Sequence, residues 1–203
     1  MLYASLKAEV KSRLQSLHLE TSLFRVPRSR VEQTFRAEFC YLQLRRITEI
    51  VSIAVLLVHN PYERFRTKTL TKIYNADELL NALAKLSASA FPQSALSMGK
   101  PPYEGGAVHF AIPKPSFDTR EAIKEIYTTA CDRLHMGSLR TVLKTRSKQY
   151  SIDFIKRSFD RLCGLLNSHI IVLPDKRVMH AWMDWASDEN VRCQWLDLST
   201  PQR

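Results

Sequence analysis

The sequence predicts a mainly α fold: a helical bundle with a small C-terminal antiparallel β-meander, α+β overall. Three observations lead to this prediction. Apolar residues recur at three- and four-residue spacing through most of the first 168 residues, which is the period of an amphipathic helix. Beyond residue 168 the period falls to two, as expected for strands. Only 5 glycines occur among 203 residues, too few for a turn-rich all-β fold.

A chain of this length suits one domain. We expect the bundle to occupy residues 1–168. Prolines and glycines gather in its middle and predict a long loop around 88–117. Residues 169–203 should form a three-stranded β appendage that packs on the bundle.

The first helices are defined by their apolar stripes and their ends. Over residues 1–20, one stripe is expected to hold Leu2, Leu6, Val10, Leu14 and Leu17. After a basic linker, Ser29 and Glu32 form a capping box that predicts the start of a long helix over 30–58. Asn60-Pro61 ends this helix, because the residue before a proline is pushed out of the α region.

Further helices are expected over 76–87, 119–134 and 153–167. Alternating apolar residues then predict strands over 170–173, 178–185 and 191–198. This order of elements places all the strands after the bundle.

The net charge of +10 indicates a surface that attracts polyanions, so we expect contact with RNA or DNA. Two groups of basic residues are the candidate nucleic-acid contacts. The first is Arg64, Arg66 and Lys68, and the second is Arg140, Lys144, Arg146 and Lys148.

Several classes of function are excluded by missing motifs. The sequence has neither of the common glycine-rich nucleotide-binding motifs, no CxxC pair and no histidine pair with metal-ligand spacing. We therefore expect no cofactor, no metal and reduced cysteines. No apolar segment is long enough to span a bilayer, so we expect a cytoplasmic protein without membrane contact.

Glu49 is the first candidate site residue. The long helix carries a stripe at alternating four- and three-residue spacing: Phe35, Phe39, Leu42, Arg46, Glu49, Ile53 and Leu56. Two charges interrupt this apolar stripe, and we expect them inside the bundle. A buried carboxylate needs a partner, and Arg45 and Arg46 are near enough to provide one. The group is either a structural ion pair that fixes helix register, or a polar pocket in which Gln43, Arg46 and Glu49 bind a ligand.

His135 is the second candidate. It follows the predicted helix 119–134, with Arg133 two residues before it and Gly137 two residues after it. A helix C-terminus stabilises a protonated histidine, and histidine titrates near neutral pH. It is therefore either a helix-capping residue or a general acid or base. The other histidines have no polar neighbours at useful spacing.

The segments FCYLQLRRITEIVSIAVLLVHN and IYTTACDRLHMGSLR, followed by a helix ending LLNSHIIVL, resemble a family of uncharacterised bacterial and phage-borne proteins. The resemblance covers roughly residues 38–173. The architecture is similar to that of HEPN domains, helical bundles of toxins and antiphage systems, many of which are metal-independent ribonucleases.

This resemblance implies RNA cleavage with His135 as the proton-transfer group. The HEPN signature places an arginine four to six residues before the histidine, whereas Arg133 lies only two residues before it. The arginine would then come from elsewhere, with Arg46 as the candidate and Glu49 orienting it, or the activity is absent.

Two hypotheses follow. The first is a nucleic-acid-binding protein, of the HEPN-like ribonuclease, toxin or antiphage defence type. The second is a non-catalytic module that dimerises or docks a partner protein through apolar helix faces, with Arg46 and Glu49 as a structural ion pair.

Overall fold

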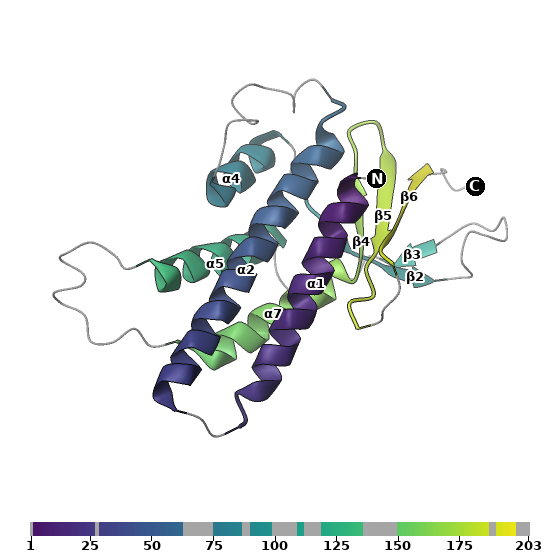
Figure 1. Ribbon diagram of the computed structural model, residues 1–203. Helices are drawn as coiled ribbons and strands as arrows, with labels where there is room; N and C mark the ends of the chain where they lie inside the picture. The colour runs from purple at the N-terminus through teal and green to yellow at the C-terminus, as the bar shows by residue number, and fades with distance from the viewer. Residues whose placement is uncertain are drawn as a thin grey trace.

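The computed structural model describes residues 2–26, 29–62, 75–86, 90–98, 109–111, 119–135, 150–186 and 190–197. It confirms a mainly α fold with a small antiparallel sheet (Figure 1). The helices are α1 (Leu2–Leu23), α2 (Arg30–His59), α4 (Ala76–Leu86), α5 (Thr119–Leu134) and α7 (Ile152–Leu166). The strands are β1 (Gln93–Ser94), β2 (Leu96–Met98), β3 (His109–Ala111), β4 (Ser168–Val172), β5 (Arg177–Trp182) and β6 (Arg192–Asp197).

The predicted capping box starts α2. The backbone N–H of Glu32 donates to Ser29 Oγ at 3.2 Å, and the backbone N–H of Ser29 donates to Glu32 Oε2 at 3.2 Å. At the other end the N–H of Asn60 donates to the carbonyl of Leu57 at 3.3 Å. Both ends of the long helix therefore lie within one residue of their predicted positions. The predicted reason for the second end was wrong, because Asn60 keeps α-helical angles before Pro61 (φ −55°, ψ −29°).

The predicted stripe of α1 was partly wrong. The buried face of α1 runs through Tyr3, Lys7, Val10, Leu14 and Leu17 at four- and three-residue spacing, whereas Leu2 is 61% exposed. Leu6 of the predicted stripe packs partly against the core, but Tyr3 and Lys7 are the buried residues of the first two turns. Lys7 was passed over because its charge suggested an exposed position.

The main sheet has the strand order β1-β4-β5-β6, and every pair is antiparallel. Strands β4, β5 and β6 confirm the predicted meander. Within the range predicted as a long loop, 88–117, β1 joins this sheet and β2 pairs with β3. Strands of two or three residues are too short to give a periodic sequence signal.

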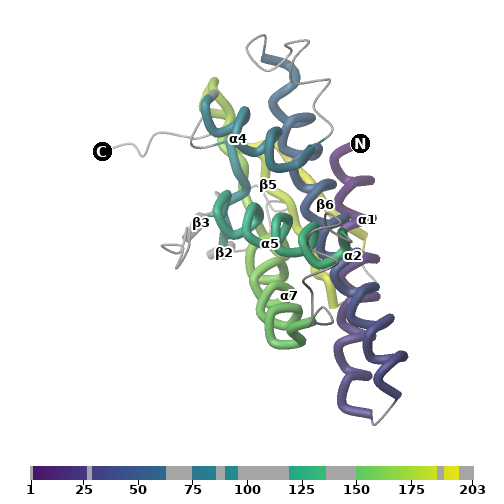
Figure 2. The backbone as a smooth tube through the Cα atoms, turned by 90° about the vertical axis from the view of Figure 1, so that its left-hand side faces the viewer, coloured from purple at the N-terminus to yellow at the C-terminus, as the bar shows by residue number. Residues whose placement is uncertain are grey.

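One face of the sheet shares the core of the bundle. Ile171, Met179 and Ala181 belong to the same cluster of buried side chains as the helices. The opposite face holds a smaller cluster that includes Ile170 and Val178. Figure 2 shows α1 and α2 running side by side along one edge of the molecule. This edge carries the candidate site.

Candidate functional site

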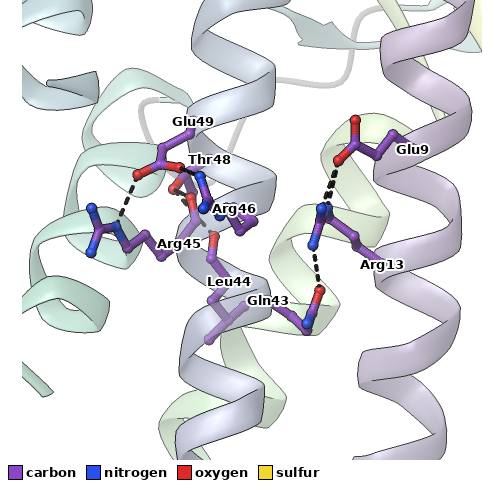
Figure 3. A network of polar contacts seen from close by, with 8 residues as sticks. All are labelled: Glu9, Arg13, Gln43, Leu44, Arg45, Arg46, Thr48 and Glu49. Carbon is purple, nitrogen blue, oxygen red and sulfur yellow. Dashed lines mark hydrogen bonds and ion pairs between the residues drawn. The ribbon is translucent and has the colours of Figure 1, made fainter. Parts of the chain in front are cut away.

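Glu49 is held by two neighbouring arginines (Figure 3). Arg45 Nε donates to Glu49 Oε1 at 2.9 Å, and Arg46 Nη1 donates to Glu49 Oε2 at 3.0 Å. The Glu49 side chain is 16% exposed, compared with 31% for Arg45 and 57% for Arg46. The prediction of a largely buried carboxylate paired with these arginines is confirmed. The hydrogen bond to Glu49 is also the main reason that the pKa of Arg45 is raised.

Gln43 belongs to a different contact. Its Oε1 accepts from Arg13 Nη1 on α1 at 2.9 Å, and the same guanidinium pairs with Glu9 at 2.6 Å. In Figure 3 the Gln43 side chain points toward α1, whereas Arg45 extends away from α1. The expected pocket of Gln43, Arg46 and Glu49 is therefore divided. Gln43 joins α1 to α2, and Glu49 closes an ion pair within α2.

We name the row Phe35, Phe39, Leu42, Arg46, Glu49, Ile53 and Leu56 the α2 stripe. The expectation that this row lies inside the bundle was wrong. Phe35 is 65% exposed, Ile53 is 51% exposed, and Phe39 and Leu42 are 40% and 41% exposed. Only Leu56, near the end of the row, packs partly against the core.

The stripe faces outward because α2 has a second and larger apolar face. That face is fully buried, and it includes Cys40, Leu44, Ile47, Val51, Val55 and Val58. Two polar side chains on the buried side of α2 form hydrogen bonds within the helix. The Thr48 hydroxyl donates to the carbonyl of Leu44 at 3.2 Å, and the Ser52 hydroxyl donates to the carbonyl of Thr48 at 2.8 Å. Because both faces of α2 are apolar, spacing alone could not tell which of them packs into the core.

His135 is exposed and lies directly after α5. Its backbone N–H donates to the carbonyl of Cys131 at 2.9 Å, which closes the last turn of that helix. Arg133 is half-buried, and its positive charge acts on the hydroxyls of Tyr41 and Tyr150. Burial raises the pKa of Tyr150 to about 12, and its hydroxyl donates to Glu38 Oε1 at 2.5 Å. This hydrogen bond ties the residues that precede α7 to the first half of α2.

The predicted nucleic-acid contacts lie outside the described residues. They are Arg64, Arg66, Lys68, Arg140, Lys144, Arg146 and Lys148. Within the described ranges, no group of three histidine, cysteine or acidic side chains is arranged to hold a metal ion. The helices in those ranges include none with the length and apolar character needed to cross a bilayer.

A buried polar group between α1 and the sheet was missed at the sequence level. The hydroxyl of Tyr3 and Nε2 of His169 are hydrogen-bonded at 2.7 Å, and His169 Nδ1 contacts the carbonyl of Leu166 at 3.1 Å. Lys7 is 1% exposed, and its Nζ has no hydrogen-bond partner among the described residues. Burial lowers the pKa of Lys7 to about 7. Its place on the Tyr3–Val10–Leu14 stripe was the signal that could have revealed it.

His180 also has a partner that its sequence neighbours did not suggest. The Ser168 hydroxyl and His180 Nε2 lie 3.0 Å apart, on adjacent antiparallel strands. Burial lowers the pKa of His180 to about 4, so its imidazole is neutral at physiological pH and is a weak base. This serine–histidine contact joins β4 and β5.

Comparison of the chain with protein families, with curated proteins and with solved structures found no match. The resemblance to HEPN domains therefore stays a prediction, and the functional argument depends on the geometry of this chain.

Proposed function

We propose that the protein is a protein–protein interaction module and that the α2 stripe is its docking surface. The observation that carries this proposal is the exposure of Phe35, Phe39, Leu42 and Ile53 on one face of the longest helix. Single exposed apolar residues are ordinary, but several large ones on one helix face usually mark an interaction site, and here they lie on both sides of Arg46 and Glu49. An apolar helix face of this kind is recognised by another helix that lies along it.

The ion pair of Glu49 supports an interaction role over a catalytic one. Both carboxylate oxygens already accept from guanidinium groups, at 2.9 and 3.0 Å. A carboxylate that accepts a charge-assisted hydrogen bond at each oxygen is the anchor of an ion pair. It provides a fixed polar position inside an apolar stripe, a device that sets the register of paired helices.

Cross-linking can test this proposal. A photoreactive amino acid would replace Phe39 in the full-length chain, and the control would carry it at the exposed Ser12 of α1. After irradiation in cells, we expect cross-linked products from position 39 in clear excess over position 12. Mass spectrometry would then identify the captured chain. Equal yields from both positions would contradict the use of the α2 stripe as a docking surface.

Nucleic-acid binding is a second candidate function, favoured by the net charge of +10. The exposed His135 at the end of α5 would be the proton-transfer group if binding leads to RNA cleavage. Titration of a labelled single-stranded RNA at two salt concentrations tests the binding. No binding at low salt would reject this candidate.

A further inference from the structure

The α2 stripe has the spacing of a coiled-coil seam. Its members follow one another at steps of four and three residues from Phe35 to Leu56, the repeat that keeps a seam facing a partner helix. At 1.5 Å per residue the row is about 32 Å long. The two charged members, Arg46 and Glu49, stand next to each other near its middle and have opposite sign.

This pattern is complementary to itself when two copies are antiparallel. If a two-fold axis passes α2 at the level of Ile47 and Thr48, Arg46 of each copy faces Glu49 of the other. On either side of this centre, Leu42 then faces Ile53, and Phe39 faces Leu56. From Phe39 to Leu56, each charged position thus meets the opposite charge and each apolar position meets an apolar side chain. Phe35 lies beyond these pairs and faces position 60, the C-cap Asn60.

We propose that two copies of this chain associate through their α2 stripes as an antiparallel, two-fold symmetric dimer. This inference rests on the proposed interaction role of the stripe and names its partner. An interface of this type uses the same patch on both subunits, as the commonest homodimers do.

A parallel arrangement of the same helices is disfavoured by charge. In register, it would place Arg46 against Arg46 and Glu49 against Glu49 of the second copy. Like charges brought together in an apolar interface cost several kcal/mol of binding free energy. The order of the two charges along α2 therefore selects the antiparallel arrangement.

The ion pairs of Glu49 within one subunit allow Arg46 to pair instead with Glu49 of the second copy. Arg46 is the more exposed of the two arginines, at 57%, so its side chain is free to reach across an interface. In the single chain, Arg45 Nε donates to Glu49 Oε1 at 2.9 Å. In the dimer this hydrogen bond would be kept. Glu49 would then accept from one arginine of each subunit, and no charge would be left unpaired in the seam.

Sedimentation equilibrium of the full-length chain tests the dimer and its geometry. We expect the wild type to dimerise, and Arg46→Glu and Glu49→Arg each to weaken the dimer by about 100-fold or more, since like charges then face each other. An equimolar mixture of the two variants should restore the dimer, because each charge again meets its opposite. Arg157→Glu, on the exposed side of α7, is the control and should dimerise like the wild type.

Thermal unfolding of each variant separates lost association from lost folding. A folded Arg46→Glu chain that still dimerises with wild-type affinity would overturn the inference, as would a wild type that stays monomeric at the highest soluble concentration. If the wild type is monomeric while position 39 cross-links to a different protein, the docking function stands and the homodimer is wrong. If position 39 captures nothing above its control, both are wrong.

Discussion

Lys7 should destabilise the folded protein at neutral pH. Its amine is enclosed between α1 and the sheet, near Tyr3, His169 and Cys193, and no described residue offers it a hydrogen bond. Burial lowers its pKa from the ordinary 10.5 to about 7. The folded chain therefore releases this proton at a lower pH than the unfolded chain.

The sign of the effect follows from proton linkage. Between about pH 7 and pH 10.5 the unfolded chain binds more protons at Lys7 than the folded chain, so stability increases as the pH rises through this range. The two pKa values correspond to a cost of roughly 4 kcal/mol at pH 7 and roughly 3 kcal/mol at pH 8.5. Between these two pH values Lys7 alone should increase the free energy of unfolding by roughly 1–2 kcal/mol.

The perturbation is Lys7→Met, which keeps the length of the side chain and removes the charge. We expect the variant to be more stable at pH 7, by up to roughly 4 kcal/mol, and to lack most of the rise in stability toward pH 8.5. His169 does not interfere, because burial holds its pKa well below 6.5 and it stays neutral in this range. Urea unfolding monitored by circular dichroism at both pH values measures the two effects.

Lys156→Met, at an exposed position of α7, is the matched control and should leave both quantities nearly unchanged. The reasoning would be refuted if Lys7→Met had wild-type stability at pH 7 together with a wild-type pH dependence. That result would mean that the amine has an acceptor or water in the folded protein.

Three further predictions concern the other candidate residues. His135→Ala should lower any RNA cleavage by about 10²–10⁴-fold without changing the melting temperature if His135 transfers a proton, whereas a capping role predicts a lower melting temperature and unchanged activity. Neutralising Lys144, Arg146 and Lys148 together should weaken RNA binding and flatten its salt dependence; a titration with unchanged affinity and slope would remove them from the interface. Ser29→Ala should cost about 1 kcal/mol by breaking the capping box of α2, to be measured by urea unfolding against Ser12→Ala.

Local signals in the sequence predicted the helices well. The Ser29–Glu32 capping box acts over a few residues, so the start of α2 could be located without knowledge of the fold. Pro61 marked the end of α2, although Asn60 before it keeps α-helical angles. The alternation after residue 168 likewise predicted β4, β5 and β6. Strand β1 could not be predicted, because two residues form a strand only when β4 is beside them.

The candidate site was predicted less completely. The pairing of Glu49 with Arg45 and Arg46 depends on positions one turn apart and was correct. The prediction that the α2 stripe faces the inside of the bundle was wrong. Which face of α2 is buried depends on where α1 and α5 pack, and not on α2 alone. The partners of Gln43 and His169 are 30 and 166 residues away in the chain, beyond the reach of any local pattern.

The contact between Tyr3 and His169 also constrains the order of events during synthesis. Tyr3 lies on α1, and its partner lies 166 residues later in the chain, on β4. At about 5–20 residues per second, that separation corresponds to roughly 10–30 s of translation. During this time α1 can pair with α2, but the face that carries Tyr3 and Lys7 has no sheet to cover it. The nascent chain therefore exposes this face until β4 and the strands that follow it emerge.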